Sequence, residues 1–188
     1  MRALFDRIAS LRGAIPLAAI EVRETPVERW RVGGASLLIK RDDLSADVLG
    51  GNKARALQLL LAGVTLGDTL LTVGATGSTH ALAVARHGAA LGAACEVVTW
   101  PQELNDVARV TAAALAREAR VTHARSVADA YVRAALRRAT RRVRWIAAGG
   151  SVPLGALGHV GAALELIEQL RRDGIALPST IVVPLGSG

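Results

Sequence analysis

Short apolar runs alternate with stretches of helical periodicity along most of this chain, and that alternation limits the folds open to it. Runs typical of strands lie at 36–40, 69–73, 96–100, 120–123, 144–147 and 180–184. Helical patterns lie between them at 52–63, 78–92, 105–117, 129–140 and 154–172. Strands that alternate with helices of this length indicate βαβ units. We therefore expect an α/β fold of three layers, with a parallel sheet between two layers of helices.

Polar residues precede four of these helical patterns. Asn52, Ser78, Asn105 and Asp129 can each accept a hydrogen bond from an otherwise unpaired backbone N–H, so we expect them to be N-caps. Residues 1–20 show no clear pattern apart from a turn near Pro16, and we expect a poorly defined leader there.

Composition excludes several classes of protein. Hydrophobic residues make up 51% of the 188 and charged residues 21%, which excludes a disordered chain. The single cysteine, Cys95, cannot form an internal disulfide. Arg7 and Arg12 interrupt the apolar N-terminus, and no run approaches the roughly 20 apolar residues of a membrane span. We expect a soluble, cytoplasmic protein with no membrane partner.

The net charge of +7 comes almost entirely from arginine, since Lys40 and Lys53 are the only lysines among 23 basic residues. A basic chain can attract nucleic acid. Aromatic residues, which single-strand binders use to stack bases, are only 3% of this chain and disfavour that reading. One cluster of arginines is expected to be the exposed face of a helix and its exit: Arg133, Arg137, Arg138, Arg141, Arg142 and Arg144.

Glycines and small polar residues gather where four of the expected strands end or helices begin. These segments are 50–53, 74–80, 149–151 and 186–188. Ligands of open α/β sheets bind outside the carboxyl ends of the strands. We therefore expect the segments to share one edge of the sheet and to form a binding site.

Lys53 is the residue in these segments best suited to covalent chemistry. It falls in the first turn of a helix, where the macrodipole repels a cation. That repulsion, the nearby Arg55 and partial burial would together lower the pKa of the amine, and a neutral amine can form an imine, which arginine cannot. The alternative is an ordinary exposed lysine at a helix end.

Three of the segments together resemble one family. Residues 50–57 (GGNKARAL) are similar to the lysine segment of the tryptophan-synthase-β-like, or fold type II, pyridoxal-phosphate enzymes. Residues 77–80 (GSTH) resemble the Ser-Asn-His segment of the 1-aminocyclopropane-1-carboxylate deaminase and D-cysteine desulfhydrase group. Residues 149–158 (GGSVPLGALG) resemble that group's Gly-Gly-Ser-x-Pro-Leu-Gly-x-Leu-Gly segment. The three matches occur in the family's order.

The resemblance implies a role for each matching residue. Lys53 would bind pyridoxal 5'-phosphate as an imine and then move the substrate proton, and Ser78 would contact substrate and assist proton transfer. Asn52 and His80 would lie beside the cofactor, although a capping role for the first and a purely structural role for the second are equally open. The backbone of Gly186, Ser187 and Gly188 would hold the cofactor phosphate. No metal is expected.

Two features depart from the family pattern. Thr79 stands where the family has an asparagine that hydrogen-bonds the ring hydroxyl of the cofactor, and threonine has a shorter reach. The sequence also stops within the phosphate-binding loop, so we expect a truncated gene product or a fragment. The resemblance implies three parts: 1–53 from a large domain, 54–148 as a complete small α/β domain, and 149–188 as more of the large domain.

The resemblance implies a deaminase or lyase that converts a small amino acid, similar to aminocyclopropanecarboxylate or D-cysteine, into a 2-oxo acid and ammonia. The first alternative is a catalytically inactive relative of the same fold. The second, less favoured, is a basic nucleic-acid-binding module. Family members also suggest a homodimer.

Overall fold

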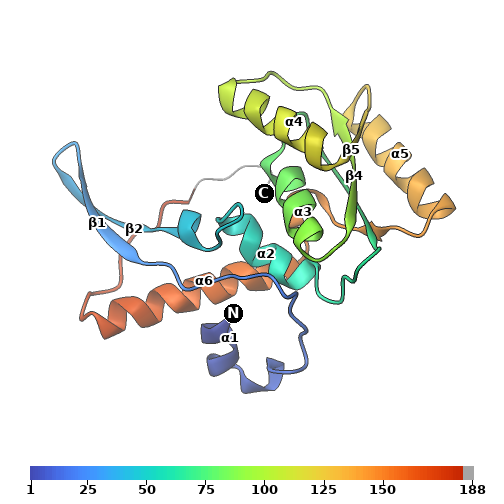
Figure 1. Cartoon of the computed structure of the whole chain (residues 1–188). Helices are drawn as coiled ribbons and strands as arrows, with labels where there is room; N and C mark the ends of the chain where they lie inside the picture. Colours follow the sequence, from blue (N-terminus) through green and yellow to red (C-terminus); the bar gives the residue numbers. More distant parts are fainter. Residues whose placement is uncertain (184–188) are drawn as a thin grey trace.

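The computed structural model describes residues 1–183 of the chain (Figure 1). Its α-helices are α1 (Arg2–Arg7), α2 (Asn52–Leu60), α3 (Thr79–Ala90), α4 (Asp106–Glu118), α5 (Val127–Thr140) and α6 (Pro153–Arg172). Its strands are β1 (Val27–Val32), β2 (Ala35–Lys40), β3 (Thr69–Ala75), β4 (Ala94–Trp100), β5 (Arg120–His123) and β6 (Arg144–Trp145). Short 3₁₀ turns are η1 (Ala9–Leu11), η2 (Asp42–Leu44) and η3 (Ala148–Gly150). No helix within residues 1–183 is long and apolar enough to cross a membrane.

Four strands form a parallel sheet in the order β5-β4-β3-β6, which confirms the expected sheet. In β3 and β4 the residues between the strand ends are buried. A strand covered on both faces needs apolar residues at successive positions rather than at alternate ones. The segment 69–73 largely meets that requirement with Leu70, Leu71 and Val73, while the buried Thr72 hydroxyl lies 3.4 Å from His80 Nε2.

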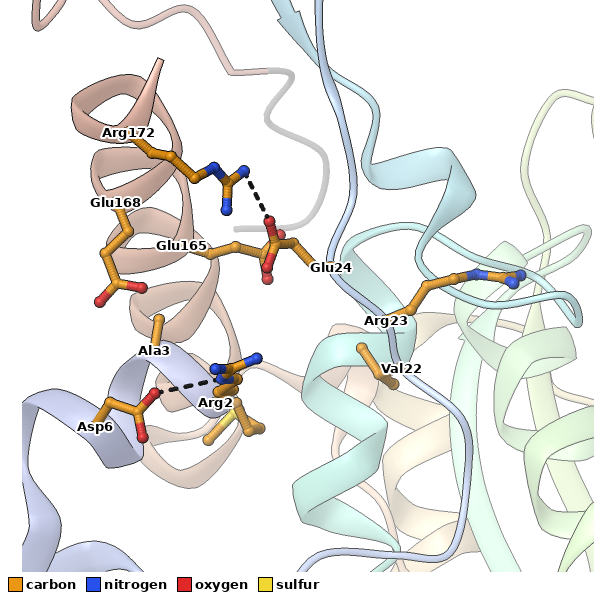
Figure 2. Close-up of a pocket in the computed structure, with 10 residues that line it drawn as sticks. Arg2, Ala3, Asp6, Val22, Arg23, Glu24, Glu165, Glu168 and Arg172 are labelled. Atoms are coloured by element: carbon orange, nitrogen blue, oxygen red, sulfur yellow. Dashed lines mark hydrogen bonds and ion pairs between the residues drawn. The ribbon is translucent and has the colours of Figure 1, made fainter. Parts of the chain in front are cut away.

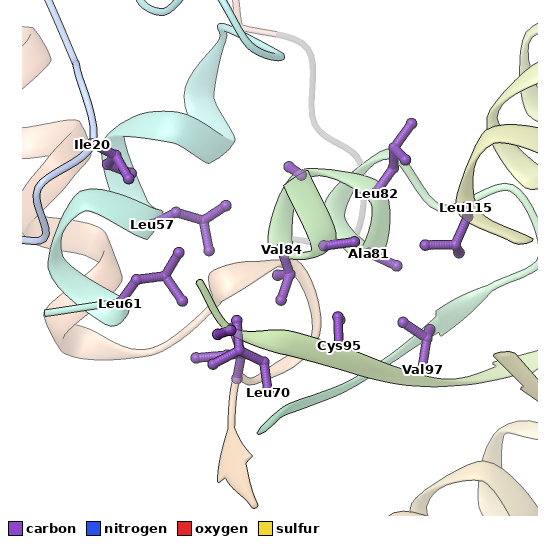
Figure 3. Close-up of a cluster of buried hydrophobic side chains, with 14 of the residues drawn as sticks. Ile20, Leu57, Leu61, Leu70, Ala81, Leu82, Val84, Cys95, Val97 and Leu115 are labelled. Atoms are coloured by element: carbon purple, nitrogen blue, oxygen red, sulfur yellow. The ribbon is translucent and has the colours of Figure 1, made fainter. Parts of the chain in front are cut away.

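Helices cover both faces of this sheet, which confirms the three-layer αβα arrangement (Figure 1). Leu70 and Val97 face a core built with α3 and α4 (Figure 3). The neighbouring residues Leu71 and Val98 point the other way, into a second core with Ala130 and Ala134 of α5. Successive strand residues therefore serve opposite layers, as the period of two requires.

The N-terminal residues are more ordered than expected. The leader prediction for 1–20 is wrong, because α1 buries Ala3, Leu4 and Phe5 and packs against α6. The expected strand at 36–40 is β2, and it pairs antiparallel with β1, which the sequence reading missed. In β1, Glu28, Arg29 and Arg31 are charged and the hairpin is largely exposed, so it lacks the apolar run of a buried strand. The three-part division of the chain stays a prediction.

Two of the four predicted N-caps are confirmed. The Ser78 and Asn105 side chains accept hydrogen bonds from the backbone N–H groups of Ala81 and Ala108. Asn52 is wrong as a cap, because it is the first residue of α2 and Gly51, with φ of 111°, precedes it. The prediction that Asp129 caps α5 is also wrong, because Asp129 lies inside that helix.

The cap of α5 is Ser126, whose Oγ accepts from the Asp129 N–H at 3.2 Å. The Asp129 carboxylate instead accepts from the Arg125 N–H at 2.8 Å, so it braces the turn before the helix. The predicted strand at 180–184 is not formed in its described part, because residues 180–183 are exposed and have no strand partner there. Residue 184 lies outside the described residues.

Glycines in α6 let it approach α2 at backbone distance. A Cβ on Gly158 would lie 2.5 Å from the Arg55 carbonyl oxygen, and one on Gly155 would lie 2.2 Å from the Gly150 carbonyl oxygen. Real Cβ atoms do not approach backbone so closely. Small residues at these positions therefore decide how near α6 lies to the start of α2.

Gly158→Ala should destabilise the fold by about 1–3 kcal/mol, because the added methyl overpacks a contact with backbone that cannot rotate away. Gly161→Ala in the same helix is the matched control, since its Cβ would lie 3.3 Å from the flexible Met1 Sδ and at ordinary contact distance, 3.8 and 3.9 Å, from Met1 Cα and Leu4 Cβ. The control should be neutral or gain up to about 1 kcal/mol from helix propensity. Urea unfolding of both variants checks this, and equal effects would contradict the assigned contact.

Candidate active site

The strand order places a switch point between β3 and β6. From β3 the chain proceeds to β4 and β5 on one side, whereas β6 pairs with the other side of β3. Connections leaving β3 and β6 therefore diverge, and open α/β sheets bind ligands in the crevice outside the strand ends at such a point. The segment leading into α3 and the turn η3 follow these two strands. Both contain residues singled out in the sequence.

Lys53 reaches this switch point from the first turn of α2. Its Nζ donates a hydrogen bond to the Gly149 carbonyl oxygen at 3.0 Å, and the side chain is half-buried. Burial lowers the pKa of the amine below the ordinary lysine value. The expected contribution of Arg55 to that pKa shift is wrong, because the Arg55 guanidinium is itself paired with Asp42 and Glu165.

His80 is buried near the same amine. Its Nε2 lies 3.4 Å from Thr72 Oγ1 on β3, and its Cε1 lies 4.0 Å from where a Cβ on Gly150 would be. Burial, and then the positive charge of Lys53, lower the pKa of His80 to about 4. The imidazole is therefore neutral near pH 7 and adds no second positive charge beside the Lys53 amine.

The other predicted site residues differ in how far they are exposed to solvent. Ser78 is half-buried at the N-terminus of α3, where its Oγ caps Ala81 N–H at 3.2 Å and keeps its own hydrogen to donate. Thr79 is exposed in the first turn of α3, and Asn52 is exposed at the start of α2. Gly186, Ser187 and Gly188 lie outside the described residues.

Ser78 fits its position only because a neighbouring residue has no side chain. A Cβ on Gly74, the penultimate residue of β3, would lie 2.8 Å from both Cβ and Oγ of Ser78. The serine hydroxyl therefore occupies the space directly beyond the strand end. Glycine at 74 was part of the predicted segment 74–80, but this reason for it emerges only from the packing.

His159 belongs to the neighbourhood of Lys53 and was missed in the sequence. It follows Gly158 in α6, and its pKa is lowered by burial and then by the charge of Lys53, while Asp42 acts in the opposite direction. The signal available was its place one residue after the glycine-rich segment. The sequence could not say that α6 turns this residue toward α2.

A buried ionic cluster lies beneath the site and joins α2 to β2 and α6. Arg55, only 2% exposed, donates to Asp42 Oδ1 at 2.8 Å and to Glu165 Oε1 at 3.0 Å. Lys40 also donates to Glu165 and to Gln169. Burial would raise the pKa of Glu165, but the hydrogen bonds from Arg55 and Lys40 lower it to about 2. The carboxylate is thus ionised throughout the physiological range.

A separate cavity of about 380 Å³ opens between α1, α6 and the segment 22–24 (Figure 2). Glu24, Glu165 and Arg172 are among the residues that line it, and Arg172 is paired with Glu24 at 3.3 Å. None of the predicted site residues line it. The chemistry predicted from the sequence therefore lies elsewhere, at the strand ends.

The residues gathered at the strand ends fit the attachment of an aldehyde cofactor. A primary amine with a lowered pKa donates to a carbonyl oxygen, and its charge helps to keep a nearby imidazole neutral. Hydroxyls of Ser78 and Thr79 stand at the N-terminus of α3, whose partial positive charge suits an anionic ligand. An amine, a neutral imidazole and two hydroxyls near the ends of these strands are groups that fit such a cofactor.

The neutral buried His80 predicts a loss of stability in mild acid. Because its folded-state pKa of about 4 lies below the unfolded value of about 6.5, the unfolded chain takes up the proton first as pH falls. The free energy of unfolding should therefore decrease by on the order of 3 kcal/mol as the pH falls from 6.5 towards 4.

Chemical denaturation of wild type and His80→Gln across this pH range isolates the effect as a difference between the two curves. His123→Gln, at an exposed histidine, is the control and should keep the wild-type slope. A wild-type slope in the His80 variant would mean that this imidazole is already protonated or solvated in the folded state.

Comparisons with known proteins agree with this geometry. The family model for pyridoxal-phosphate dependent enzymes matches residues 19–188. A putative 1-aminocyclopropane-1-carboxylate deaminase of Pyrococcus furiosus is 32% identical, over 98% of this chain and 59% of its own length. The D-cysteine desulfhydrase of Serratia proteamaculans is 34% identical, over 82% of this chain and 51% of its own.

Another relative is named for a different reaction, and a solved structure shares the fold. The nocardicin C-9' epimerase of Nocardia uniformis is 35% identical, over 92% of this chain and 55% of its own length. The crystal structure of an ACC deaminase homologue superposes with a TM-score of 0.69 and 28% identity, over 90% of this chain and 54% of that one. The chain spans about half the length of the curated relatives it matches. It belongs to the family of pyridoxal-phosphate dependent enzymes, and the resemblance to the deaminase and desulfhydrase group is confirmed.

Proposed function

We propose that this chain provides the lysine half of a pyridoxal-phosphate site that deaminates a small amino acid, similar to aminocyclopropanecarboxylate or D-cysteine, to a 2-oxo acid and ammonia. The observation that carries the proposal is the state of the Lys53 amine at the strand switch point. The amine is half-buried, donates a hydrogen bond to the Gly149 carbonyl oxygen and has a lowered pKa. A cytoplasmic location and a homodimer belong to the same proposal.

Each residue of the site has a task in this reaction. Lys53 holds the cofactor through its amine and, once released, accepts and returns the substrate α-proton, which its lowered pKa favours. The cofactor, when bound, supplies an electron sink for the substrate carbanion. His80 stays neutral and keeps the surroundings of the amine free of further positive charge.

Ser78 and Thr79 offer hydroxyls to the cofactor and the substrate. Ser78 keeps a donatable hydrogen while its oxygen caps α3, so it can orient a substrate carboxylate or pass a proton. Thr79 presents one short O–H donor where the family's asparagine would present an amide. We infer that this exchange changes which small amino acid is accepted, because the hydrogen bond to the ring oxygen becomes weaker or longer.

The alternative within the same family is cofactor binding without turnover. The observation that favours it is that this chain spans about half the length of its curated relatives. The two proposals differ in a measurable way, since both require covalent attachment at Lys53 but only the first requires release of ammonia.

Borohydride treatment of the chain with pyridoxal phosphate should remove a visible absorbance band and leave the cofactor covalently on the peptide that contains Lys53. Lys53→Arg should lose the adduct entirely, because arginine keeps the charge but cannot form an imine. Lys40→Arg is the matched control, since it alters the only other lysine and keeps its positive charge. Peptide mass spectrometry gives the readout.

Labelling of Lys40 or the N-terminus in place of Lys53 would contradict the assigned site. Ammonia release from D-cysteine or aminocyclopropanecarboxylate, lost in Lys53→Arg, would support the deaminase. An adduct without ammonia from any small amino acid would favour the binding-only alternative.

A further inference from the structure

The excess positive charge of this chain is confined to one segment. Of the 23 basic and 16 acidic residues, eight arginines and one aspartate lie within 120–144, which leaves 15 of each sign in the rest of the chain. The whole net charge of +7 therefore belongs to β5, α5 and the start of β6. Arginine-rich codon usage would spread such charge along the sequence rather than collect it here.

Carboxylates within the described residues neutralise only part of this charge. Three arginines share the single carboxylate of Glu96: Arg120 at 3.7 Å, Arg137 at 3.5 Å and Arg141 at 3.2 Å. Asp129 pairs with Arg133 at 2.8 Å. The expectation of a merely solvated arginine face is wrong for Arg137, which is largely buried between Glu96 and Thr122. Arg138 and Arg142 remain exposed on α5 and directly after it.

The outward side of α5 is apolar. Ala130 and Ala134 pack on the sheet, so Val132 and Leu136 point away from it and are 58% and 60% exposed. Exposed alanines at 128, 135 and 139 extend this stripe along the helix. Arg133 borders the stripe on one side and Arg138 on the other, as their positions in the helix require. The result is an exposed apolar stripe with one arginine on each side.

The charge of the α5 surface and the contacts of its aromatic rings indicate which kind of partner it binds. A second copy would bring an equally basic surface against this one and be repelled. Single-stranded nucleic acid would need free aromatic faces. Here Trp100 and Tyr131 stack on each other at 6.4 Å, Trp145 packs against Tyr131 at 6.3 Å, and the Arg138 guanidinium covers the Trp145 ring at 5.4 Å. An anionic bilayer surface accepts both apolar side chains and arginines.

We propose that α5 and the arginines around it form a docking surface for membranes rich in anionic phospholipid. Val132 and Leu136 enter the boundary between headgroups and acyl chains, and Arg138 and Arg142 contact lipid phosphates. The sequence excluded a membrane partner because no segment can span one, but binding at the interface requires no span. The surface lies on the layer of the sheet opposite α3, so it is independent of the proposed function.

Sedimentation of the full chain with vesicles tests this directly. Vesicles of phosphatidylcholine and phosphatidylglycerol should bind the protein, vesicles of phosphatidylcholine alone should not, and added salt should weaken binding. Arg138→Gln with Arg142→Gln should weaken binding about fivefold for each arginine removed. Val132→Ser with Leu136→Ser should also weaken it, because the apolar stripe is lost.

The controls are on α4, which covers the other face of the sheet and exposes Arg109 and Val110. Arg109→Gln and Val110→Ser match the substitutions in type and should bind like wild type. Lys53→Arg should also bind normally, so failure of the cofactor proposal leaves this one intact. Binding to neutral vesicles, equal loss in the α4 variants, or binding to single-stranded DNA with no binding to anionic vesicles would each overturn the proposal.

Discussion

The Arg55 guanidinium, buried between Asp42 and Glu165, fixes the geometry on which the candidate site depends. Three separate parts of the chain, η2, α2 and α6, meet at this one cation. Lys40, at the end of β2, pairs with the Glu165 carboxylate of the same cluster. Removing one partner from a buried ion pair leaves an uncompensated charge, at a cost of about 3–5 kcal/mol. The cluster therefore restricts α2 to one position against α6, and the close backbone approach at Gly158 reinforces it.

That position carries Lys53 to the carboxyl ends of the strands. The first turn of α2 points its amine at the Gly149 carbonyl, which follows β6, while His80 comes from the helix that follows β3. Burial that lets the helices pack also lowers the pKa values of Lys53 and His80, so packing and reactivity have one physical origin. Arg55 and Lys53 lie two residues apart in different surroundings. The Arg55 guanidinium is paired with carboxylates, whereas the Lys53 amine donates to a carbonyl and pairs with no carboxylate within residues 1–183.

The sequence predicted the sheet and its helices well, because strands buried on both faces require largely apolar runs, as at 69–73 and 96–100. It failed where tertiary contacts decide. The hairpin strand β1 has no buried face, residues 2–7 form a helix that packs on α6, and Gly51 rather than Asn52 precedes α2 as its cap. Lys53 and His80 were found through their segments, whereas His159 and the Arg55 cluster were not, because helical periodicity does not say which helix a face will meet.

The pKa of the Lys53 amine tests the account most directly. In Lys40→Arg protein Lys53 is the only lysine, so an NMR titration of its side-chain carbon next to the amine gives one unambiguous curve. The account predicts a midpoint clearly below the ordinary lysine value of about 10.4, returning toward that value when the chain is unfolded in urea. A folded-state midpoint at or above the ordinary value would show that the amine is solvated, and the proposed attachment site would be contradicted.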